Sequence, residues 1–301
     1  MGGGIGEALE AHETSVGSAV EAGAPRLLVT SAGSANGGGY GEILCFDAVG
    51  EPIGAFSSDP RIVDPRGLSL DPSGGLIYVN SGDDRVLALD RLGHVVHDSG
   101  RISGLDPGGG AFGPDGRYYV GMRRAGTILA MPAALDGVRE RLLPDGIVLF
   151  PRGFGFACDR RLYLASGVDP SGEGDNTIMV FDRSGALPPR RLVTDAELSP
   201  LDLTVAPNGH IVVASEFPFG APDAVTSIRE YDAATGQLMR VLVPDPSCEF
   251  RRPRGLRFGS DHRLYCVGEE HVVAFDFSTG SFLGSVVQLE RLNGQALVLL
   301  V

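Results

Sequence analysis

The sequence predicts an all-β fold, a six-bladed β-propeller closed by pairing of the C-terminal strand with the N-terminal blade. Three observations carry this prediction: a composition rich in turn residues, a repeated unit of blade length, and incomplete copies of that unit at the two ends. The 301 residues include 44 glycines and 20 prolines spread along the chain, as tight turns between short strands require. A chain of this length can form one all-β domain with a substantial core.

The repeated unit opens with Pro-x-Gly and an alternating strand, passes through a Gly or Asp turn, and continues into a strand such as Leu-Tyr-Val. After a variable loop it ends in a further strand and an Asp-containing turn. Successive copies begin 39 to 53 residues apart, which is about the length of a four-stranded blade. The copies start at Pro65, Pro107, Pro151, Pro200 and Pro253, with Leu292-Asn293-Gly294 as a sixth start.

The two ends of the chain complement each other. The sixth copy stops after one strand, NGQALVLLV, whereas the segment from Pro25 holds the later strands of a blade and lacks the first. Together they make one blade, and the ring then closes without an open edge where the ends meet. We therefore expect an N-terminal extension at residues 1–24 and a propeller at residues 25–301.

Charge and composition exclude several classes of function. The net charge of −13 opposes general binding to nucleic acid or to an anionic membrane, because both depend on a basic surface. All 25 basic residues are arginine, which excludes Schiff-base chemistry on a lysine and a P-loop lysine. No apolar stretch is long enough to span a bilayer. A small anionic or carbonyl-bearing molecule is the expected partner.

The cysteines and the N-terminal segment indicate the compartment. Cys45, Cys158, Cys248 and Cys266 are widely spaced and show no CxxC or Cys/His ligand spacing. We therefore expect no structural zinc and a reducing environment. The N-terminal segment has neither the basic region nor the continuous apolar region of a secretory signal. We expect a cytoplasmic protein.

The repeat resembles a known family. The stretch PRGLSLDPSGGLIYVN, residues 65–80, resembles an NHL repeat, and residues 25–301 resemble the six-bladed propellers of NHL proteins and the SMP-30/gluconolactonase group. This resemblance implies the fold and leaves the function open, since such propellers include lactonases, lyases, amidating enzymes and scaffolds without catalysis.

A shorter motif resembles a second group. Glu269-Glu270-His271 resembles the Glu-x-His of the virginiamycin B lyase group, which lies on a propeller face and acts in an elimination. The likeness implies catalytic roles for Glu269 and His271. From the residues alone, His271 can equally begin the third strand of its blade as an exposed side chain.

The arginines of the repeat point to a binding site. The first strand of each blade lines the central channel, so the x of Pro-x-Gly lies at the channel mouth once per blade. Three arginines from alternate blades would form an anion site suited to a carboxylate or phosphate. Alternatively, each arginine is structural, covering apolar surface and bonding loop carbonyls or a carboxylate. The mouth residues are Arg66, Gly108, Arg152, Leu201, Arg254 and Asn293, with Asp202 in place of the fifth glycine.

Acidic residues accompany the arginines on this face. Glu216 and Glu269 directly follow the ends of second strands, where serines are expected to cap turns. With Asp202 they are candidates for general acid or base work, or they pair with mouth arginines. The SMP-30 resemblance implies a divalent cation held by Glu, Asn and Asp, and Asp202 and Asn293 match two of these three. No glutamate matches the third, and the arginines oppose a dication; we expect no cofactor, with a divalent metal as the alternative.

Two functional hypotheses follow. The first is a small-molecule enzyme of the lyase or lactone-hydrolase type that acts on an anionic or carbonyl-bearing metabolite at the channel mouth. The second is a non-catalytic binding propeller that holds a peptide or metabolite on the same face. The catalytic candidates are His271, Glu269 and Glu216, and the substrate-binding candidates are Arg66, Arg152, Arg254, Asn293 and Asp202.

Overall fold

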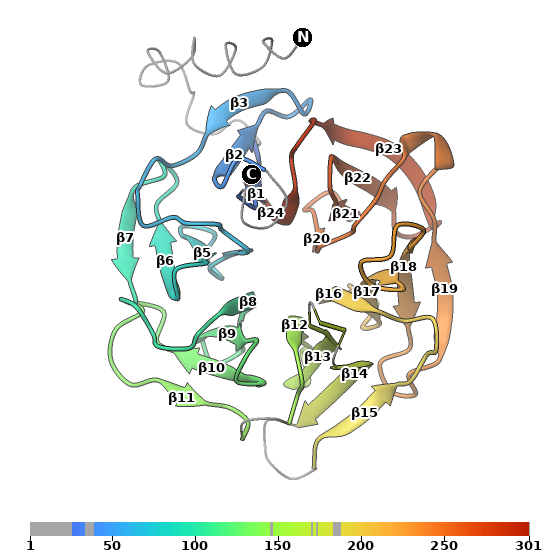
Figure 1. Cartoon of the computed structure of the whole chain (residues 1–301), viewed down its shortest axis with the longest axis horizontal. Helices are drawn as coiled ribbons and strands as arrows, with labels where there is room; N and C mark the ends of the chain where they lie inside the picture. The colour runs from blue at the N-terminus through green and yellow to red at the C-terminus, as the bar shows by residue number, and fades with distance from the viewer. Residues whose placement is uncertain are drawn as a thin grey trace.

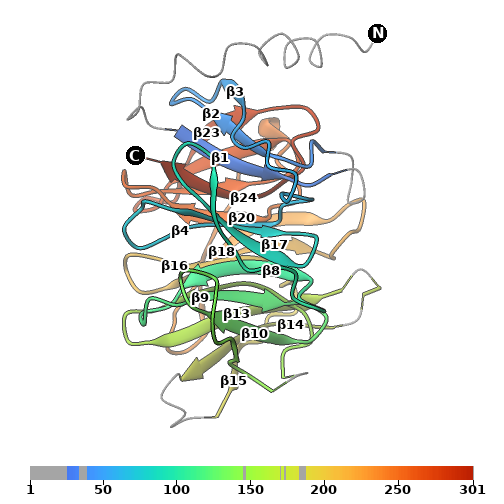
Figure 2. The same cartoon turned by 90° about the vertical axis from the view of Figure 1, so that its left-hand side faces the viewer.

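The computed structural model is a closed ring of six four-stranded antiparallel sheets, shown face-on in Figure 1 and from the side in Figure 2. It describes residues 26–33, 39–144, 147–169, 171–172, 174–182 and 188–300. The all-β class and the six blades are as the sequence predicts. The proposed extension at residues 1–24 and Pro25 lie outside the described residues.

The first blade combines the two ends of the chain: β24 (Gly294–Leu300), β1 (Arg26–Ser31), β2 (Ile43–Phe46) and β3 (Pro52–Ala55). The second blade holds β4 (Gly67–Leu70), β5 (Ile77–Ser81), β6 (Arg85–Leu89) and β7 (Val95–Asp98). The third holds β8 (Pro107–Phe112), β9 (Tyr118–Met122), β10 (Thr127–Met131) and β11 (Glu140–Arg141).

The fourth blade consists of β12 (Pro151–Phe156), β13 (Arg161–Val168), β14 (Gly174–Asp182) and β15 (Arg190–Val193). The fifth consists of β16 (Pro200–Val205), β17 (Ile211–Phe217), β18 (Val225–Tyr231) and β19 (Leu238–Leu242). A short 3-10 helix, η2 (Pro246–Cys248), precedes the sixth blade, which holds β20 (Gly255–Phe258), β21 (Arg263–Val267), β22 (His271–Asp276) and β23 (Ser281–Gln288).

The C-terminal strand closes the ring. β24 pairs antiparallel with β1, from Arg26 opposite Leu300 to Ser31 opposite Gly294, and Figure 1 shows this last strand in red beside the blue N-terminal blade. Because β1 is then paired on both sides, with β24 and with β2, its edge is not left open at the join.

The inner strands begin where the Pro-x-Gly units predict. β8, β12 and β16 start at Pro107, Pro151 and Pro200, whereas β4 and β20 start at the glycine of the unit. Each inner strand contacts the inner strands of the neighbouring blades around the ring. The six strands therefore surround one central channel, and the residues at their starts share one end of it.

Apolar side chains hold neighbouring blades together. Six clusters of buried residues each combine side chains from two adjacent blades; one, for example, joins Leu28 and Ile43 of the first blade to Leu68 and Leu87 of the second. The core is thus a ring of interfaces around the channel. The channel walls are fixed by this packing, which makes them a rigid frame for a site.

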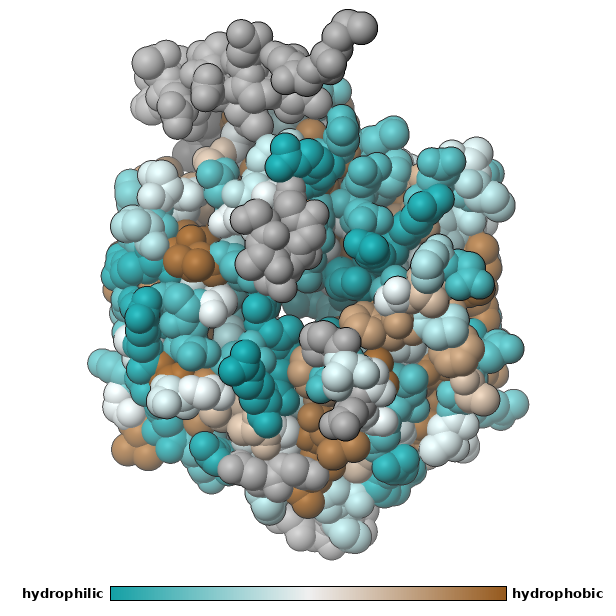
Figure 3. All heavy atoms as spheres, viewed as in Figure 1, coloured by the Kyte–Doolittle hydropathy of each residue, from teal (hydrophilic) through white to brown (hydrophobic). Residues whose placement is uncertain are grey.

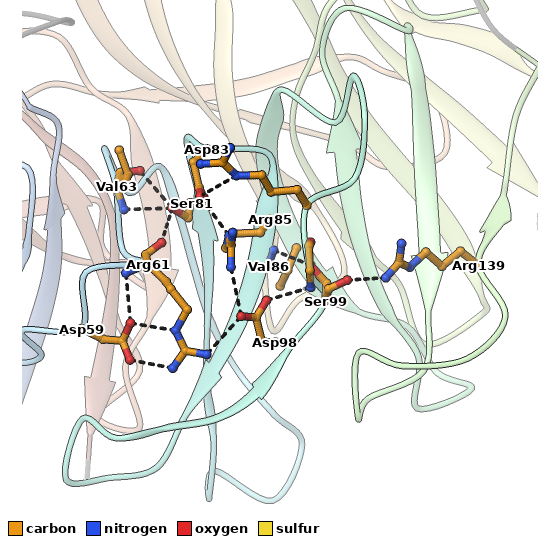
Figure 4. Close-up of polar contacts among 12 residues, drawn as sticks. Asp59, Arg61, Val63, Ser81, Asp83, Arg85, Val86, Asp98, Ser99 and Arg139 are labelled. Carbon is orange, nitrogen blue, oxygen red and sulfur yellow. Dashed lines mark hydrogen bonds and ion pairs between the residues drawn. The ribbon is translucent and has the colours of Figure 1, made fainter.

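Ion pairs tie the connections between blades, as Figure 4 shows around the second blade. Arg61, in the segment that enters this blade, pairs with Asp59 at 2.6 Å and with Asp98 at 3.0 Å. Asp98 also accepts from Arg85, which pairs with Asp83. This network fixes the outer strand of the blade to the incoming chain. None of the helical segments in the described part of the chain has the length and apolar character needed to cross a membrane.

Candidate functional site

A narrow cavity of about 70 Å³ lies at the end of the channel where the inner strands begin. We call it the arginine cavity. All three mouth arginines predicted from the repeat, Arg66, Arg152 and Arg254, line it. Two further arginines, Arg123 and Arg257, join them. Figure 3 shows the face seen in Figure 1, where hydrophilic residues lie around a central hollow.

Arg66 is held by carboxylates. Its guanidinium pairs with Asp106 at 2.8 Å and with Asp64 at 3.4 Å. Arg123, which follows β9, donates to the same Asp106 at 2.6 Å. Burial raises the pKa of Asp106, and the charge of Arg66 counters that effect. This side of the cavity is a compensated cluster, as the structural reading of the mouth arginines predicts.

Arg254 is also paired. Its guanidinium donates to the Glu216 carboxylate at 2.9 Å, and the Glu216 side chain is only 4% exposed. A buried carboxylate of this kind depends on its cationic partner. Glu216 therefore meets a mouth arginine, one of the two roles predicted for it.

Asp202 takes a partner that the sequence reasoning did not foresee. It is buried, and burial raises the pKa of its carboxyl while Arg257 acts against that shift. Its Oδ2 accepts from Arg257 at 3.1 Å and from the backbone N–H of Leu256 at 2.9 Å. Arg257 also donates to the Leu68 carbonyl of the second blade. The Arg257 side chain thus reaches across the channel from the sixth blade to the second.

Arg152 differs from the other arginines of the cavity. Its guanidinium carbon lies 4.5 Å from the ring centre of Phe150 and 4.7 Å from that of Phe219. Nη2 donates to the Val168 carbonyl at 2.6 Å, whereas Nε is buried without a hydrogen-bond partner. Among the described residues no carboxylate lies within ion-pair distance. Gly167 leaves room for the Arg152 side chain, because a Cβ at residue 167 would stand 3.1 Å from Nε.

Desolvation makes the charged form of Arg152 less favourable. Desolvation lowers the pKa of Arg152 to about 9 and the nearby Arg254 adds to the effect, whereas the charges of Glu216 and Asp169 act against it. The guanidinium nevertheless remains charged at neutral pH. Five arginines line the cavity, and the carboxylates that pair with four of them are those of Asp64, Asp106, Asp202 and Glu216. Arg152 is therefore the one arginine of the described walls without a carboxylate at ion-pair distance.

Two predicted residues of this face lie outside the lining of the cavity. The Asn293 amide donates to the Ala32 carbonyl at 3.3 Å, and its Oδ1 accepts from Gln295. Glu269 pairs with Arg252, not with a mouth arginine, at 2.8 Å. Glu269 and Glu216 instead share a second cleft of about 650 Å³ on the loops of the fifth and sixth blades. Glu216 thus connects this cleft to the arginine cavity through Arg254.

His271 begins β22, as predicted, but it is buried and not exposed. Its Nδ1 lies 3.1 Å from the Ser285 hydroxyl of β23 and 3.9 Å from the Cys248 thiol. Burial lowers the pKa of the imidazole. His271 lines neither the arginine cavity nor the adjoining cleft. The Glu-x-His motif therefore does not bring its histidine to the mouth arginines.

The strand-end serines bond to the segments that enter the inner strands of their blades, whereas turn capping was predicted from the sequence. Ser31 donates to the Leu292 carbonyl, and Ser81 accepts from the backbone N–H of Val63. Ser215 accepts from that of Ser199. In the described part of the chain, no group of three or more His, Cys, Asp or Glu side chains is arranged to hold a metal ion.

Several contributors to the site were not predicted, among them Arg123, Arg257 and Phe219, and the first two left a signal in the sequence. Arg123 directly follows Met122, the residue at the position of the strand-end serines, just as Glu216 follows Ser215. Arg257 shares its position in the inner strand with much smaller residues, such as Ser69 and Gly155, as strand register shows. Phe219 lies in a loop, where no repeat position marks it.

Comparisons with known proteins support the fold. No family model matches the chain, and no curated protein matches it. A structure titled as a nidogen/laminin complex is 16% identical, with a TM-score of 0.72 over 92% of this chain and 98% of the other. A gluconolactonase from Xanthomonas campestris is 17% identical, with a TM-score of 0.61 over 75% and 76%.

A virginiamycin B lyase from Staphylococcus aureus, solved in a catalytically inactive form with quinupristin, is 14% identical, with a TM-score of 0.57 over 83% of this chain and 78% of the other. Similarities at this level of identity show a shared architecture only. The resemblance predicted from the repeat is therefore confirmed as one of fold: the chain is a six-bladed β-propeller similar in structure to gluconolactonase and virginiamycin B lyase.

Proposed function

We propose that the protein binds a small anionic metabolite at the arginine cavity and acts on it as a lactone hydrolase or a lyase. One observation carries the proposal: the half-buried Arg152 has its guanidinium against two phenyl rings, has no carboxylate at ion-pair distance among the described residues, and keeps a buried Nε–H without an acceptor. Burying a charge without compensation is costly. A bound carboxylate or phosphate would supply the missing charge and acceptor.

The volume of the cavity limits what enters it. About 70 Å³ suits an anionic group and not a whole metabolite. The remainder of the molecule would extend toward the cleft that Glu216 and Glu269 share. Glu216 is then the carboxylate best placed to move a proton, because it lies between the anion site and that cleft.

In lactone hydrolysis, Glu216 takes a proton from water as the oxygen adds to the carbonyl carbon. The ring C–O bond then breaks, and the proton passes to the leaving alkoxide. In an elimination, Glu216 takes the proton next to a carbonyl, the Cα–Cβ double bond forms as the bond to the β-substituent breaks, and the proton passes to the departing group. The similarity in fold to a gluconolactonase and a virginiamycin B lyase supports these two reaction types.

Non-catalytic binding is the second candidate. Asp106, Asp202 and Glu216 each accept an ion pair from an arginine, so a carboxylate must exchange its partner before it can act as a base. The structure of a nidogen/laminin complex supports this alternative, since a chain of similar fold is present in an assembly of proteins.

We also infer a reducing compartment such as the cytoplasm, because Cys45, Cys158, Cys248 and Cys266 are all free thiols.

A metabolite screen tests both candidates. Thermal shift with carboxylates, phosphates and lactones should identify ligands that stabilise the parent protein and fail to stabilise Arg152→Met. Turnover of those ligands is then measured by following product. We expect Glu216→Gln to lower turnover by roughly 10²-fold or more while ligand binding persists. Binding without turnover supports the second candidate, and no anion-dependent shift refutes both.

A further inference from the structure

A second cavity occupies the opposite end of the same channel. It measures about 540 Å³, and residues from all six inner strands line it. These residues come from the later halves of the strands, whereas the arginine cavity is lined by their first halves. The two cavities are therefore successive compartments of one channel. We call the second one the apolar chamber.

Strand register places one apolar side chain per blade at the wall of the chamber. These six residues stand opposite the start of the second strand in every blade. All six are half-buried, so their side chains are incompletely covered by the protein. The ring consists of Leu70, Phe112, Phe156, Val205, Phe258 and Leu299.

The aromatic members of the ring are held in place. Phe112 meets Tyr78 edge-on with ring centres 4.7 Å apart, and Phe156 lies 4.9 Å from Tyr119. Such contacts fix ring orientation. The chamber is consequently formed before any ligand arrives, which lowers the cost of binding.

Among the described residues, Arg257 alone lines both compartments. It bonds to Asp202 and to the carbonyls of Leu256 and Leu68, and its side chain remains 24% exposed. These bonds use only part of its five N–H groups. The guanidinium thus forms a polar inner end to a chamber whose described lining residues include no acidic side chain.

We propose that the apolar chamber binds a compact, largely apolar molecule that carries one carboxylate. The volume lies within the range of small-molecule pockets, and the ring offers uncovered apolar surface on all sides. Arg257 would hold the carboxylate with its remaining donors. Arg257 is the one basic side chain among the described residues of the chamber lining, which favours a single anionic group. This site does not depend on the proposed reaction at the other end.

Calorimetric titration with naphthoate and with the corresponding naphthalene alcohol tests the proposal. The parent protein should bind both, and naphthoate about tenfold more tightly, since a charge-assisted hydrogen bond contributes roughly 1.5 kcal/mol or more. Val205→Phe should fill the chamber and weaken both ligands at least about tenfold. Val138→Phe makes the same change at an exposed position and should bind as the parent does. Arg257→Gln should still bind the naphthalene alcohol, and it should bind naphthoate no more tightly than the alcohol.

The outcomes separate this site from the arginine cavity. Val205→Phe should retain the thermal shift produced by small anions, and Arg152→Met should retain binding of the naphthalene alcohol. No binding of either probe by the parent protein, or parent-like affinity in Val205→Phe, overturns the proposal. If Val205→Phe does not fold, photolabelling of the parent with a benzophenone carboxylate decides: adducts on the peptides of Phe112, Phe156 or Phe258 support the chamber, and adducts elsewhere refute it.

Discussion

Replacing Arg152 by methionine should stabilise the free protein, whereas the same change at Arg254 should destabilise it. Both substitutions keep an unbranched apolar stem and remove one guanidinium. At Arg152 the guanidinium is half-buried, with its Nε fully buried, and no described carboxylate lies at ion-pair distance; at Arg254 it compensates the buried Glu216. The two variants are therefore matched in chemistry and opposite in expected sign.

The magnitude at Arg152 follows from its surroundings. The pKa is lowered to about 9, and since one unit corresponds to about 1.4 kcal/mol, the fall from the usual value amounts to roughly 4–5 kcal/mol. The two stacked rings return about 1–2 kcal/mol each, and the bond to Val168 about 1 kcal/mol. The net cost is on the order of 1 kcal/mol. Arg152→Met should raise the melting temperature by about 2–4 °C.

At Arg254 the calculation has the opposite sign. Arg254→Met leaves the Glu216 carboxylate buried without its partner, which costs about 3–5 kcal/mol. Differential scanning calorimetry at neutral pH measures both variants. A saturating anion at a hundred times its dissociation constant should stabilise the parent protein by about 2.7 kcal/mol and leave Arg152→Met unchanged. If Arg152→Met loses as much stability as Arg254→Met and the parent shows no anion-dependent shift, Arg152 is a structural residue and the anion site is refuted.

Three further expectations concern the frame. Deleting residues 292–301 should expose the edge of β1 and produce aggregates in size-exclusion chromatography; unchanged melting would contradict the ring closure. Burial lowers the pKa of His271, so as pH falls the imidazole is protonated in the unfolded chain before it is protonated in the folded protein. The free energy of unfolding should therefore decrease below about pH 6.5. His271→Asn should weaken this pH dependence in urea titrations. The hydrogen bond from Arg61 lowers the pKa of Asp59 to about 2. Asp59→Asn should therefore lower the free energy of unfolding by less than about 1 kcal/mol at pH 7, and by progressively less as pH falls toward 2. A loss of stability that does not change with pH would show that the ion pair is not its cause.

The architecture could be predicted because its determinants are local and repeated. Pro-x-Gly, with Asp202 in place of the glycine in the fifth blade, marks the starts of the inner strands after the first blade, and alternation marks the strands that follow. Closure by the last strand followed from one incomplete copy at each end. The mouth arginines were placed by the same logic, since Arg66, Arg152 and Arg254 all reach one cavity.

The partners of those arginines could not be predicted, because they come from other blades and from irregular loops. Asp106 precedes a different blade from Arg66, and Phe219 lies in the loop after β17. Glu269 was expected beside a mouth arginine, but it pairs with Arg252, which lies in the segment just before β20. His271 is buried because β23 and η2 cover it through Ser285 and Cys248, contacts that strand periodicity does not encode.

The unequal pairing of the arginines bears on which anions the cavity can hold. An anion at Arg66 would compete with Asp106 and Asp64, and an anion at Arg254 would compete with Glu216. At Arg152 no ion pair with a described residue must break, so binding there carries no such cost. A single arginine without a paired carboxylate also sets a limit, because a dianionic phosphate would bring a second negative charge toward Glu216 and Asp202 without a matching cation. A singly charged carboxylate balances the walls, and it presents the planar pair of acceptors that a guanidinium clamped between two rings can meet in its own plane.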